Sequence, residues 1–316
     1  MKTLYGSSLL ILSGFISLFC CNCTKDVPVS TYQTQHVVVI VVDGARYSET
    51  WAEPSRQFIP RRAALLGQGV LCSNFKNTGG TYTNAGHTAM CSGVYQTINN
   101  NGLEYPYNPS LFQFWLKNFK RPATEAWVIS SKDKLEVLSN CIDPEWKDKY
   151  RPMTDCGVNG LGTGYRDDST TFFKAKNVFT THHPRLTLIN FKEPDASGHA
   201  ADSLKYLQGI MDTDEYVQQI WQLLQNDDFY KDKTTLIVTN DHGRHTPGHL
   251  DGFVSHGDDC EGCRKIEFFA LGPDFKKNYI SQTPYEQIDM ATTIATLLGF
   301  QMPSSQGKMM KDIFVY

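Results

Sequence analysis

Five short runs of apolar, mostly β-branched residues recur along this 316-residue chain and constrain its fold more than any other feature. Such runs are typical of parallel strands buried on both faces of a sheet. The five predicted strands are His36 to Val42, Glu125 to Ser130, Arg185 to Phe191, Thr234 to Thr239 and Ile266 to Leu271.

Helical patterns separate these strands. Apolar residues at helical spacing predict helices over Ser110 to Phe119, Ser203 to Gln225 and Tyr285 to Leu298. Strands that alternate with helices predict an α/β fold, doubly wound, with a mostly parallel sheet and helices on both faces. Neither a repeat nor a low-complexity tract divides residues 30–316, so we expect a single domain there.

Residues 1–23 differ from the rest of the chain. Lys2 precedes an apolar run at residues 9–19, which is short for a bilayer span and lies where a secretory signal would lie. A cysteine directly after such a run resembles a bacterial lipoprotein signal. Leu18 favours lipidation of Cys21, whereas the Thr-Lys-Asp that follows favours Cys23. A plain cleaved signal is the alternative. Both interpretations predict export, to the bacterial periplasm or as a membrane-anchored lipoprotein.

Six cysteines follow this segment: Cys72, Cys91, Cys141, Cys156, Cys260 and Cys263. An even number in an exported chain permits disulfides, and the pairs closest in sequence are Cys141 with Cys156 and Cys260 with Cys263. A Cys-x-x-Cys can also form half of a zinc site, but these six cysteines include no second such pair to complete it. We therefore expect structural disulfides.

Carboxylates and imidazoles follow the carboxyl ends of three predicted strands. The first strand runs into Asp43, the third into Asp195 and His199, and the fourth into Asp241 and His242. In open α/β sheets the ligand site lies outside the carboxyl ends of the strands. Clustered carboxylates cannot all stay ionised together without a cation. Mixed carboxylate and imidazole ligands suit zinc, with harder divalent metals as alternatives.

Thr83 is the candidate nucleophile. It follows the pair Gly79-Gly80 and precedes an apolar stretch that ends at Ser92-Gly93. A threonine hydroxyl that opens a helix meets the helix N-terminal dipole, which favours a developing alkoxide and an incoming phosphate. The alternative is an ordinary N-cap, which is common for threonine.

The order of these motifs resembles the alkaline phosphatase superfamily. The matching motifs are Asp43-Gly44, Thr83 with His87, Asp195-x-x-x-His199, Asp241-His242-Gly243 and His256-Gly257. The sequence looks most like the threonine-nucleophile members, which are the bacterial alkaline phosphatases and the nucleotide pyrophosphatase/phosphodiesterases. The resemblance extends to Gly272-Pro273. Because the chain is short, the inserted cap of many bacterial alkaline phosphatases is expected to be small or absent.

The resemblance implies a site with two zinc ions, or two ions of another divalent metal. One ion would be held by Asp195, His199 and His256, and the other by Asp43, Thr83, Asp241 and His242. Thr83 would attack phosphorus and form a phosphothreonine intermediate. His256 is preferred to His245 and His249, which also follow the fourth strand, because His-Gly before a strand and Gly-Pro matches the last motif of the family.

Four further residues are expected to bind substrate. Backbone amides near Asn84 and a side chain from residues 99–101, taken as Asn101, would hold the non-bridging oxygens. Lys132 and Lys134 resemble the lysine and arginine that contact a monoester oxygen in threonine-nucleophile alkaline phosphatases.

These residues predict a metal-dependent phosphomonoesterase that acts on small phosphate esters. The alternatives are a nucleotide pyrophosphatase/phosphodiesterase and a phosphotransferase of the same superfamily. The net charge is −3 and no basic block is present, which argues against a nucleic-acid polymer as partner. Contact with a membrane is expected only through an N-terminal lipid anchor.

Overall fold

The computed structural model describes residues 1–3 and 31–315. Apart from its first three residues, the predicted signal segment lies outside the described residues, and so do Cys21 and Cys23. Within the described part of the chain, no helix is both long enough and apolar enough to cross a membrane.

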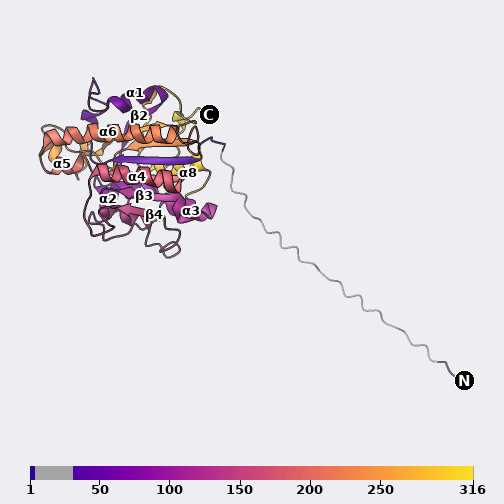
Figure 1. Ribbon diagram of the computed structural model, residues 1–316. Helices are drawn as coiled ribbons and strands as arrows, with labels where there is room; N and C mark the ends of the chain where they lie inside the picture. Colours follow the sequence, from indigo (N-terminus) through magenta and orange to yellow (C-terminus); the bar gives the residue numbers. More distant parts are fainter. Residues whose placement is uncertain (4–30, 316) are drawn as a thin grey trace.

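One mixed sheet organises the described residues (Figure 1). Its strand order is β4-β3-β5-β1-β6-β7-β2-β8, and β9 pairs with β2. The strands are β1 His36–Val42, β2 Gly69–Lys76, β3 Ala126–Ser130, β4 Met153–Cys156, β5 Leu186–Phe191, β6 Thr234–Thr239, β7 Lys265–Leu271, β8 Tyr279–Ser281 and β9 Tyr285–Glu286. The five strands from β4 to β6 in this order run parallel to one another. The predicted mostly parallel α/β fold is therefore confirmed.

Strand β7 departs from the prediction because it runs antiparallel to both of its neighbours, β6 and β2. A parallel neighbour needs a crossover connection, usually through a helix, whereas an antiparallel neighbour does not. The segment between β6 and β7 contains only a 3-10 turn and the four-residue helix α7, Glu261–Arg264, so the chain returns in the opposite direction. The predicted helix from Tyr285 also begins later, because Tyr285–Glu286 pair with β2 as strand β9.

Helices cover both faces of the sheet. They are α1 Pro60–Leu65, α2 Thr83–Ser92, α3 Leu111–Phe119, α4 Asp168–His182, α5 Asp195–His199, α6 Ser203–Gln225 and α8 Asp289–Leu298, in addition to α7. Side chains alternate between the two faces of β1, because successive residues of a strand point in opposite directions. Val37, Val39 and Val41 pack with α2, α3 and α8. Val38, Ile40 and Val42 pack with α1, α4 and α6.

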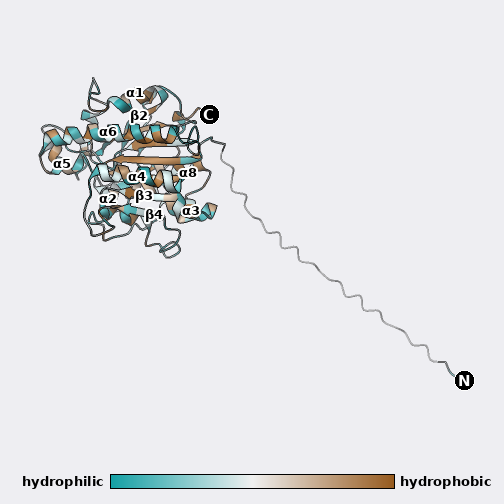
Figure 2. Cartoon of the chain, in the orientation of Figure 1, coloured by the Kyte–Doolittle hydropathy of each residue, from teal (hydrophilic) through white to brown (hydrophobic). Residues whose placement is uncertain are grey.

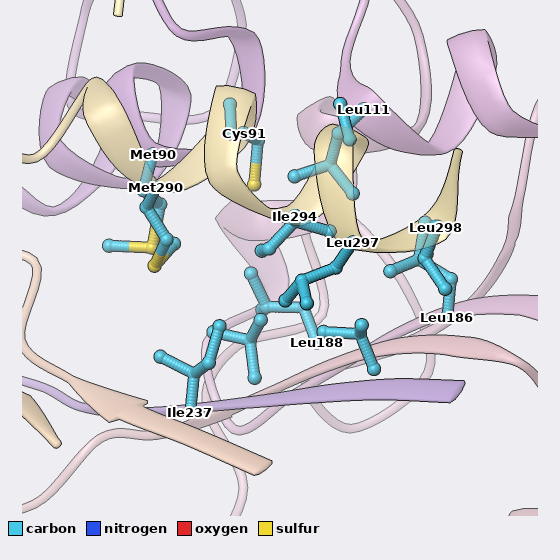
Figure 3. Close-up of a cluster of buried hydrophobic side chains, with 14 of the residues drawn as sticks. Met90, Cys91, Leu111, Leu186, Leu188, Ile237, Met290, Ile294, Leu297 and Leu298 are labelled. Atoms are coloured by element: carbon cyan, nitrogen blue, oxygen red, sulfur yellow. The ribbon is translucent and has the colours of Figure 1, made fainter. Parts of the chain in front are cut away.

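The two hydrophobic cores hold the central strands rigidly between helices. Figure 3 shows part of the first core, where Ile294 and Leu297 of α8 lie over Leu188 and Ile237 of the sheet. Figure 2 shows the same pattern at the scale of the fold, with hydrophobic residues along the central strands and polar residues on the outer sides of α4 and α6. Burying each such aliphatic side chain stabilises the fold by about 1.5–3 kcal/mol.

The predicted disulfides are not formed. All six cysteines among the described residues are free. The thiol of Cys156 points toward the Val128 carbonyl oxygen on the neighbouring strand, at 3.7 Å, rather than toward Cys141. The sulfur of Cys260 accepts the backbone N–H of Cys263 at the start of α7. For Cys141 and Cys156, proximity in sequence was thus a poor guide to pairing, because the Cys156 thiol points along its strand pair instead.

Candidate active site

Three adjacent strands bring the predicted carboxylates to one edge of the sheet. The strands β5, β1 and β6 are neighbours, and each ends next to a predicted site residue. Asp43 directly follows β1, Asp195 begins the short helix α5 after β5, and Asp241 lies two residues beyond the end of β6. All three side chains are buried. The convergence expected from the sequence is therefore present in the fold.

Asp43, Asp241 and His242 form one group of potential metal ligands, with one ligand atom from each lying within 4.8 Å of the others. Asp241 Oδ1 accepts the backbone N–H groups of Gly44 at 3.2 Å and His242 at 3.0 Å. Its other oxygen, Oδ2, is buried without a hydrogen-bond partner among the described residues, and so is His242 Nε2, which lies 3.3 Å away. These two lone-pair atoms face each other as metal ligands do.

A second group contains Asp195, His242 and His256. His199 lies beside it, because its Nε2 is 3.1 Å from His256 Nε2 and 3.4 Å from Asp195 Oδ1. The rings of His242 and His256 stack with centroids 3.7 Å apart. The structure thus brings together Asp195, His199 and His256, which the sequence predicted for one metal ion. It also places His242 in both ligand groups, whereas the sequence assigned it to one.

Hydrogen bonds orient the two stacked imidazoles. His242 Nδ1 lies 2.9 Å from the Gly243 carbonyl oxygen, and His256 Nδ1 lies 2.7 Å from the Thr81 carbonyl oxygen. A carbonyl accepts a proton held on Nδ1, so each Nε2 presents a lone pair to the cluster. Burial lowers the pKa of His242 to about 3 and that of His256 to about 2, which keeps both rings neutral. Neutral imidazole is the form that binds metals.

A single ammonium group lies among the carboxylates. Lys132 Nζ is 2.9 Å from Asp43 Oδ1 and 2.7 Å from Asp195 Oδ2. Burial opposes the charge on Lys132, but the carboxylates of Asp195 and then Asp43 raise its pKa. Burial likewise opposes the charge on Asp195, yet Lys132, followed by His242 and Arg244, holds the pKa of this carboxyl well below its usual range.

Asp241 has no comparable partner. Burial, and then the charge of Asp43, raise its pKa well above the usual range. Lys132 and Arg244 together therefore carry two positive charges against three carboxylates, and an excess of buried negative charge favours a cation. The orphaned oxygen of Asp241, the orphaned nitrogen of His242 and the mixed oxygen and nitrogen donors all fit divalent metal ions.

Thr83 begins α2, and its side chain is buried beside these groups. Its Oγ1 lies 3.2 Å from Lys132 Nζ. Tyr82, not Thr83, holds the N-cap position, and α2 has no side-chain capping bond. The alternative of an ordinary N-cap threonine is therefore wrong, and the hydroxyl points into the site at the positive end of the helix dipole.

The predicted substrate residues divide into two sets. Asn84 and Lys134 lie beside Thr83, since Asn84 is the second residue of α2 and its side-chain Nδ2 lies 3.5 Å from the Lys134 carbonyl oxygen. Lys134 is buried, and this burial, followed by the charge of Lys132, lowers its pKa to about 8. Lys132 and Lys134 are both buried, so neither is a solvated surface residue.

Asn101 is not brought to this set. It is exposed, and its Oδ1 accepts the backbone N–H of Leu103 at 2.9 Å. Asn100 takes the expected place instead, because its Oδ1 accepts the Asn84 N–H at 3.0 Å and the Lys134 ammonium at 3.0 Å. Which of three consecutive asparagines faces the helix depends on the path of the loop, which the sequence does not specify.

Two residues of the site were not predicted. Asn190, within β5, donates from Nδ2 to Asp43 Oδ2 at 3.1 Å and lies 3.3 Å from His87 Nε2. Arg244 pairs with Asp195 Oδ1 and lies 3.4 Å from His199 Nδ1. A signal for Asn190 was available, because it is an amide inside an otherwise apolar run that was predicted to be a buried strand.

The family assignment follows from comparison of the whole sequence with known families. Residues 37–247 match a family model described as type I phosphodiesterase / nucleotide pyrophosphatase. This match covers more than half of the chain and includes four of the five predicted motifs, with only the His256 motif beyond it. The chain belongs to this family. The predicted resemblance to the alkaline phosphatase superfamily is thereby confirmed.

Solved structures of the same fold agree with the assignment. An inactive variant of murine ectonucleotide pyrophosphatase/phosphodiesterase 5 in complex with AMP matches with a TM-score of 0.62 and 16% identity, covering 89% of this chain and all of that chain. A phosphonate monoester hydrolase from Silicibacter pomeroyi matches with a TM-score of 0.62 and 13% identity, covering 88% of this chain and 76% of that chain. At sequence identities this low, the two TM-scores show that the fold is shared and nothing more specific.

A curated relative is the mouse GPI ethanolamine phosphate transferase 1. It is 23% identical over 252 residues, which cover 71% of this chain and 26% of the relative. This chain therefore spans about a quarter of the length of that protein. The family and its relatives are phosphoric ester hydrolases and transferases, whereas the preference for monoesters expected from the sequence has no support among them.

Proposed function

We propose that this chain is a metal-dependent phosphodiesterase in which Thr83 attacks phosphorus, releases one alcohol and forms a phosphothreonine intermediate that keeps the second ester group until water hydrolyses it. The observation that carries the proposal is the position of the Thr83 hydroxyl. It is buried at the N-terminus of α2, 3.2 Å from the ammonium of Lys132, which also contacts Asp43 and Asp195. A hydroxyl in this position lies at the positive end of the helix dipole and next to the proposed metal ligands. An anionic phosphate would bind at the same place.

The ligand assignment is part of this proposal. Asp195, His199 and His256 would hold one divalent ion, and Asp43, Thr83, Asp241 and His242 would hold the other, with zinc as the metal that these donors favour. Bound there, the ions would supply positive charge for the attacking and leaving oxygens. The side chain of Asn100 and the ammonium of Lys134 would donate to the non-bridging oxygens of the phosphate, and the backbone N–H of Asn84, which here donates to Asn100 Oδ1, would join them by exchanging that bond for a phosphate oxygen.

A small phosphate diester or pyrophosphate is the proposed substrate class. Membership of the type I phosphodiesterase family supports it, and so does the likeness to a nucleotide pyrophosphatase/phosphodiesterase solved with AMP. A phosphotransferase remains the related alternative, since the curated relative transfers ethanolamine phosphate according to its name. Export through residues 1–23, with or without lipidation, stays a prediction.

A phosphomonoesterase is a second candidate, favoured by one observation. Lys132 and Lys134 are both buried beside Thr83, and a monoester carries one more negative charge than a diester. Two buried cations could neutralise that additional charge in a water-poor site, where electrostatic interactions are stronger than in water.

Hydrolysis of bis-p-nitrophenyl phosphate and p-nitrophenyl phosphate by zinc-loaded protein tests both candidates. We expect a higher kcat/KM for the diester. Thr83→Ala should lower turnover of both substrates by several orders of magnitude with metal content retained, and Thr83→Ser should keep partial activity. Thr88→Ala, on the same helix, is the matched control. Acid quenching of the wild type followed by mass spectrometry should find a p-nitrophenyl phosphate group on Thr83 with the diester, because the attack releases only one p-nitrophenol, and phosphate on Thr83 with the monoester.

Two results would change the assignment. Near wild-type turnover by Thr83→Ala would remove Thr83 as the nucleophile. A wild type with the higher kcat/KM for the monoester would replace the phosphodiesterase by the phosphomonoesterase.

A further inference from the structure

The segment between β6 and β7, residues 240–264, carries a second cluster of metal-ligand side chains. His245, His249, Asp258 and Cys260 each offer one ligand atom, and these four atoms lie within 4.8 Å of one another. His249 Nε2 is 2.8 Å and His245 Nε2 is 3.4 Å from the same oxygen, Asp258 Oδ2. None of the four belongs to either ligand group of the active site. We call these four residues the loop cluster.

His245 is oriented as a metal ligand. Its side chain is 4% exposed, and its Nδ1 lies 2.8 Å from Asp251 Oδ1, which also accepts the Ser255 hydroxyl at 2.8 Å. Histidines that bind metals commonly donate their other ring N–H to a carboxylate in this way. With the proton on Nδ1, the lone pair of Nε2 points toward Asp258. That buried nitrogen has no hydrogen-bond partner in the part of the chain that the structure describes.

Cys260 supplies a soft donor to the same cluster. It forms no disulfide, and its sulfur accepts the backbone N–H of Cys263 at 3.4 Å. An N–H···S bond stabilises the charge of a thiolate, which is the form of cysteine that binds metals. Residues 24–316 contain no second Cys-x-x-Cys, but the structure shows that two histidines and an aspartate lie where a second pair would be needed.

We propose that His245, His249, Asp258 and Cys260 bind a structural zinc ion, separate from the ions of the active site. Two imidazoles, a carboxylate and a thiolate are ligands that zinc prefers. Tetrahedral zinc with bonds of about 2.0–2.3 Å separates its ligands by about 3.3–3.8 Å, which is near the spacing of the loop cluster. Four protein ligands leave no open coordination position, and this arrangement is typical of structural sites.

The ion would fix the segment that carries His256 and contacts Thr81, in the loop before Thr83. His256 lies between His249 and Asp258 in the sequence, and its Nδ1 contacts the Thr81 carbonyl oxygen. The carbonyl oxygen of Asp258 accepts the Thr81 hydroxyl at 2.7 Å. Thr81 precedes Thr83 by two residues. A cross-link among four positions of a long loop reduces its conformational freedom, so zinc would hold His256 and the approach to Thr83 in one arrangement.

Metal content and cobalt spectroscopy of the full-length chain, purified under reducing conditions, test this proposal. Cys260→Ala and His249→Ala should each contain one zinc equivalent fewer than the wild type. Asp258→Asn should bind zinc more weakly than its matched control Asp259→Asn, whose side chain is 86% exposed. The cobalt-substituted wild type should show thiolate-to-cobalt charge-transfer absorption, because neither active-site group contains sulfur. This absorption should vanish in Cys260→Ala and persist in Cys141→Ala.

The zinc content and the cobalt absorption are both independent of the proposed hydrolysis, because neither measurement requires turnover of a substrate. Asp241→Asn, altered in the active site, should keep the thiolate-to-cobalt absorption. An unchanged zinc content in Cys260→Ala and His249→Ala would overturn the proposal. So would a cobalt-loaded wild type without charge-transfer absorption, or a disulfide between Cys260 and Cys263 in protein purified in parallel without reductant.

Discussion

The ammonium nitrogen of Lys132 lies 3.2 Å from the hydroxyl oxygen of Thr83. The same nitrogen donates to Asp43 and Asp195, so one side chain joins the candidate nucleophile to both groups of metal ligands. Lys132 lies two residues beyond the end of β3, and its side chain is buried. Water therefore does not reach the ammonium group to compete for these contacts. Its role should therefore depend on whether metal is bound.

Lys132→Met should destabilise the metal-free protein by about 3–5 kcal/mol, because it leaves buried carboxylates without their partner. With metal bound the loss should be smaller, since cations then compensate the same carboxylates. Urea unfolding in a chelator and in excess zinc measures the difference. Lys134→Met is the matched control, because the Lys134 ammonium contacts only Asn100 within the described residues. Equal losses with and without metal would contradict this prediction.

Lys132→Ala should also change substrate selectivity. If the ammonium neutralises the extra charge of a monoester, the variant should lose kcat/KM for p-nitrophenyl phosphate more than for bis-p-nitrophenyl phosphate. Steady-state kinetics with both substrates at saturating zinc give the ratio. Equal losses for the two substrates would mean that Lys132 acts on the ligands and nucleophile alone, and would further weaken the phosphomonoesterase candidate.

His242→Ala should reduce metal binding more broadly than Asp241→Asn. The ring of His242 belongs to both ligand groups of the active site, whereas Asp241 belongs to one. We expect Asp241→Asn to lose one equivalent of metal and His242→Ala to weaken both ions. Elemental analysis after gel filtration measures the content, with His183→Ala as a control outside the site. Full metal content in both variants would remove these residues from the proposed ligands.

The sequence predicted the elements whose signals are local. The bounds of β1 and α6 agree with the predictions, because an uninterrupted β-branched run and a long apolar stripe leave few alternatives. The meeting of Asp43, Asp195 and Asp241 was also predictable, since the carboxyl ends of parallel strands share one edge.

Features that depend on contacts distant in the sequence were not predictable. Strand β2, Gly69–Lys76, contains Ser73 and Asn74 in its middle, and its pairing with β7, β8 and β9 identifies it as a strand. The direction of β7 depends on how the preceding loop folds. That loop also places Cys260 beside two histidines, which spacing among cysteines alone could not show.

Acid should destabilise the fold through His36, at the start of β1. Its ring packs against Phe229 and Tyr230, with centroids 4.4 and 5.2 Å apart respectively. Burial, and then the nearby charge of Arg185, lower the pKa of His36 to about 3, against about 6.5 in the unfolded chain. Between these values the unfolded chain binds a proton that the folded chain does not. Stability is therefore complete above pH 6.5 and falls as the pH is lowered.

His36→Phe measures this contribution. Between pH 7 and pH 5 the wild type should lose roughly 2 kcal/mol more unfolding free energy than the variant, which follows from about 1.4 kcal/mol for each pH unit below 6.5. Urea titrations of both proteins at the two pH values, at constant zinc and ionic strength, supply the four free energies. A wild type and variant with the same pH dependence would show that His36 does not titrate on unfolding.

Asn100, rather than Asn101, should support catalysis. Its Oδ1 accepts both the Asn84 N–H at the start of α2 and the Lys134 ammonium, and these two bonds hold the Asn100 side chain near Thr83. Asn100→Ala should lower kcat by about 10²-fold, the usual loss when one donor to a developing oxyanion is removed. Asn101→Ala is the matched control and should differ little from the wild type, because this exposed side chain bonds only to Leu103 within the described residues. Steady-state kinetics with bis-p-nitrophenyl phosphate separates the two. A larger loss of kcat in Asn101→Ala than in Asn100→Ala would support Asn101, the residue predicted from the sequence. It would mean that the loop has a different path when substrate is bound.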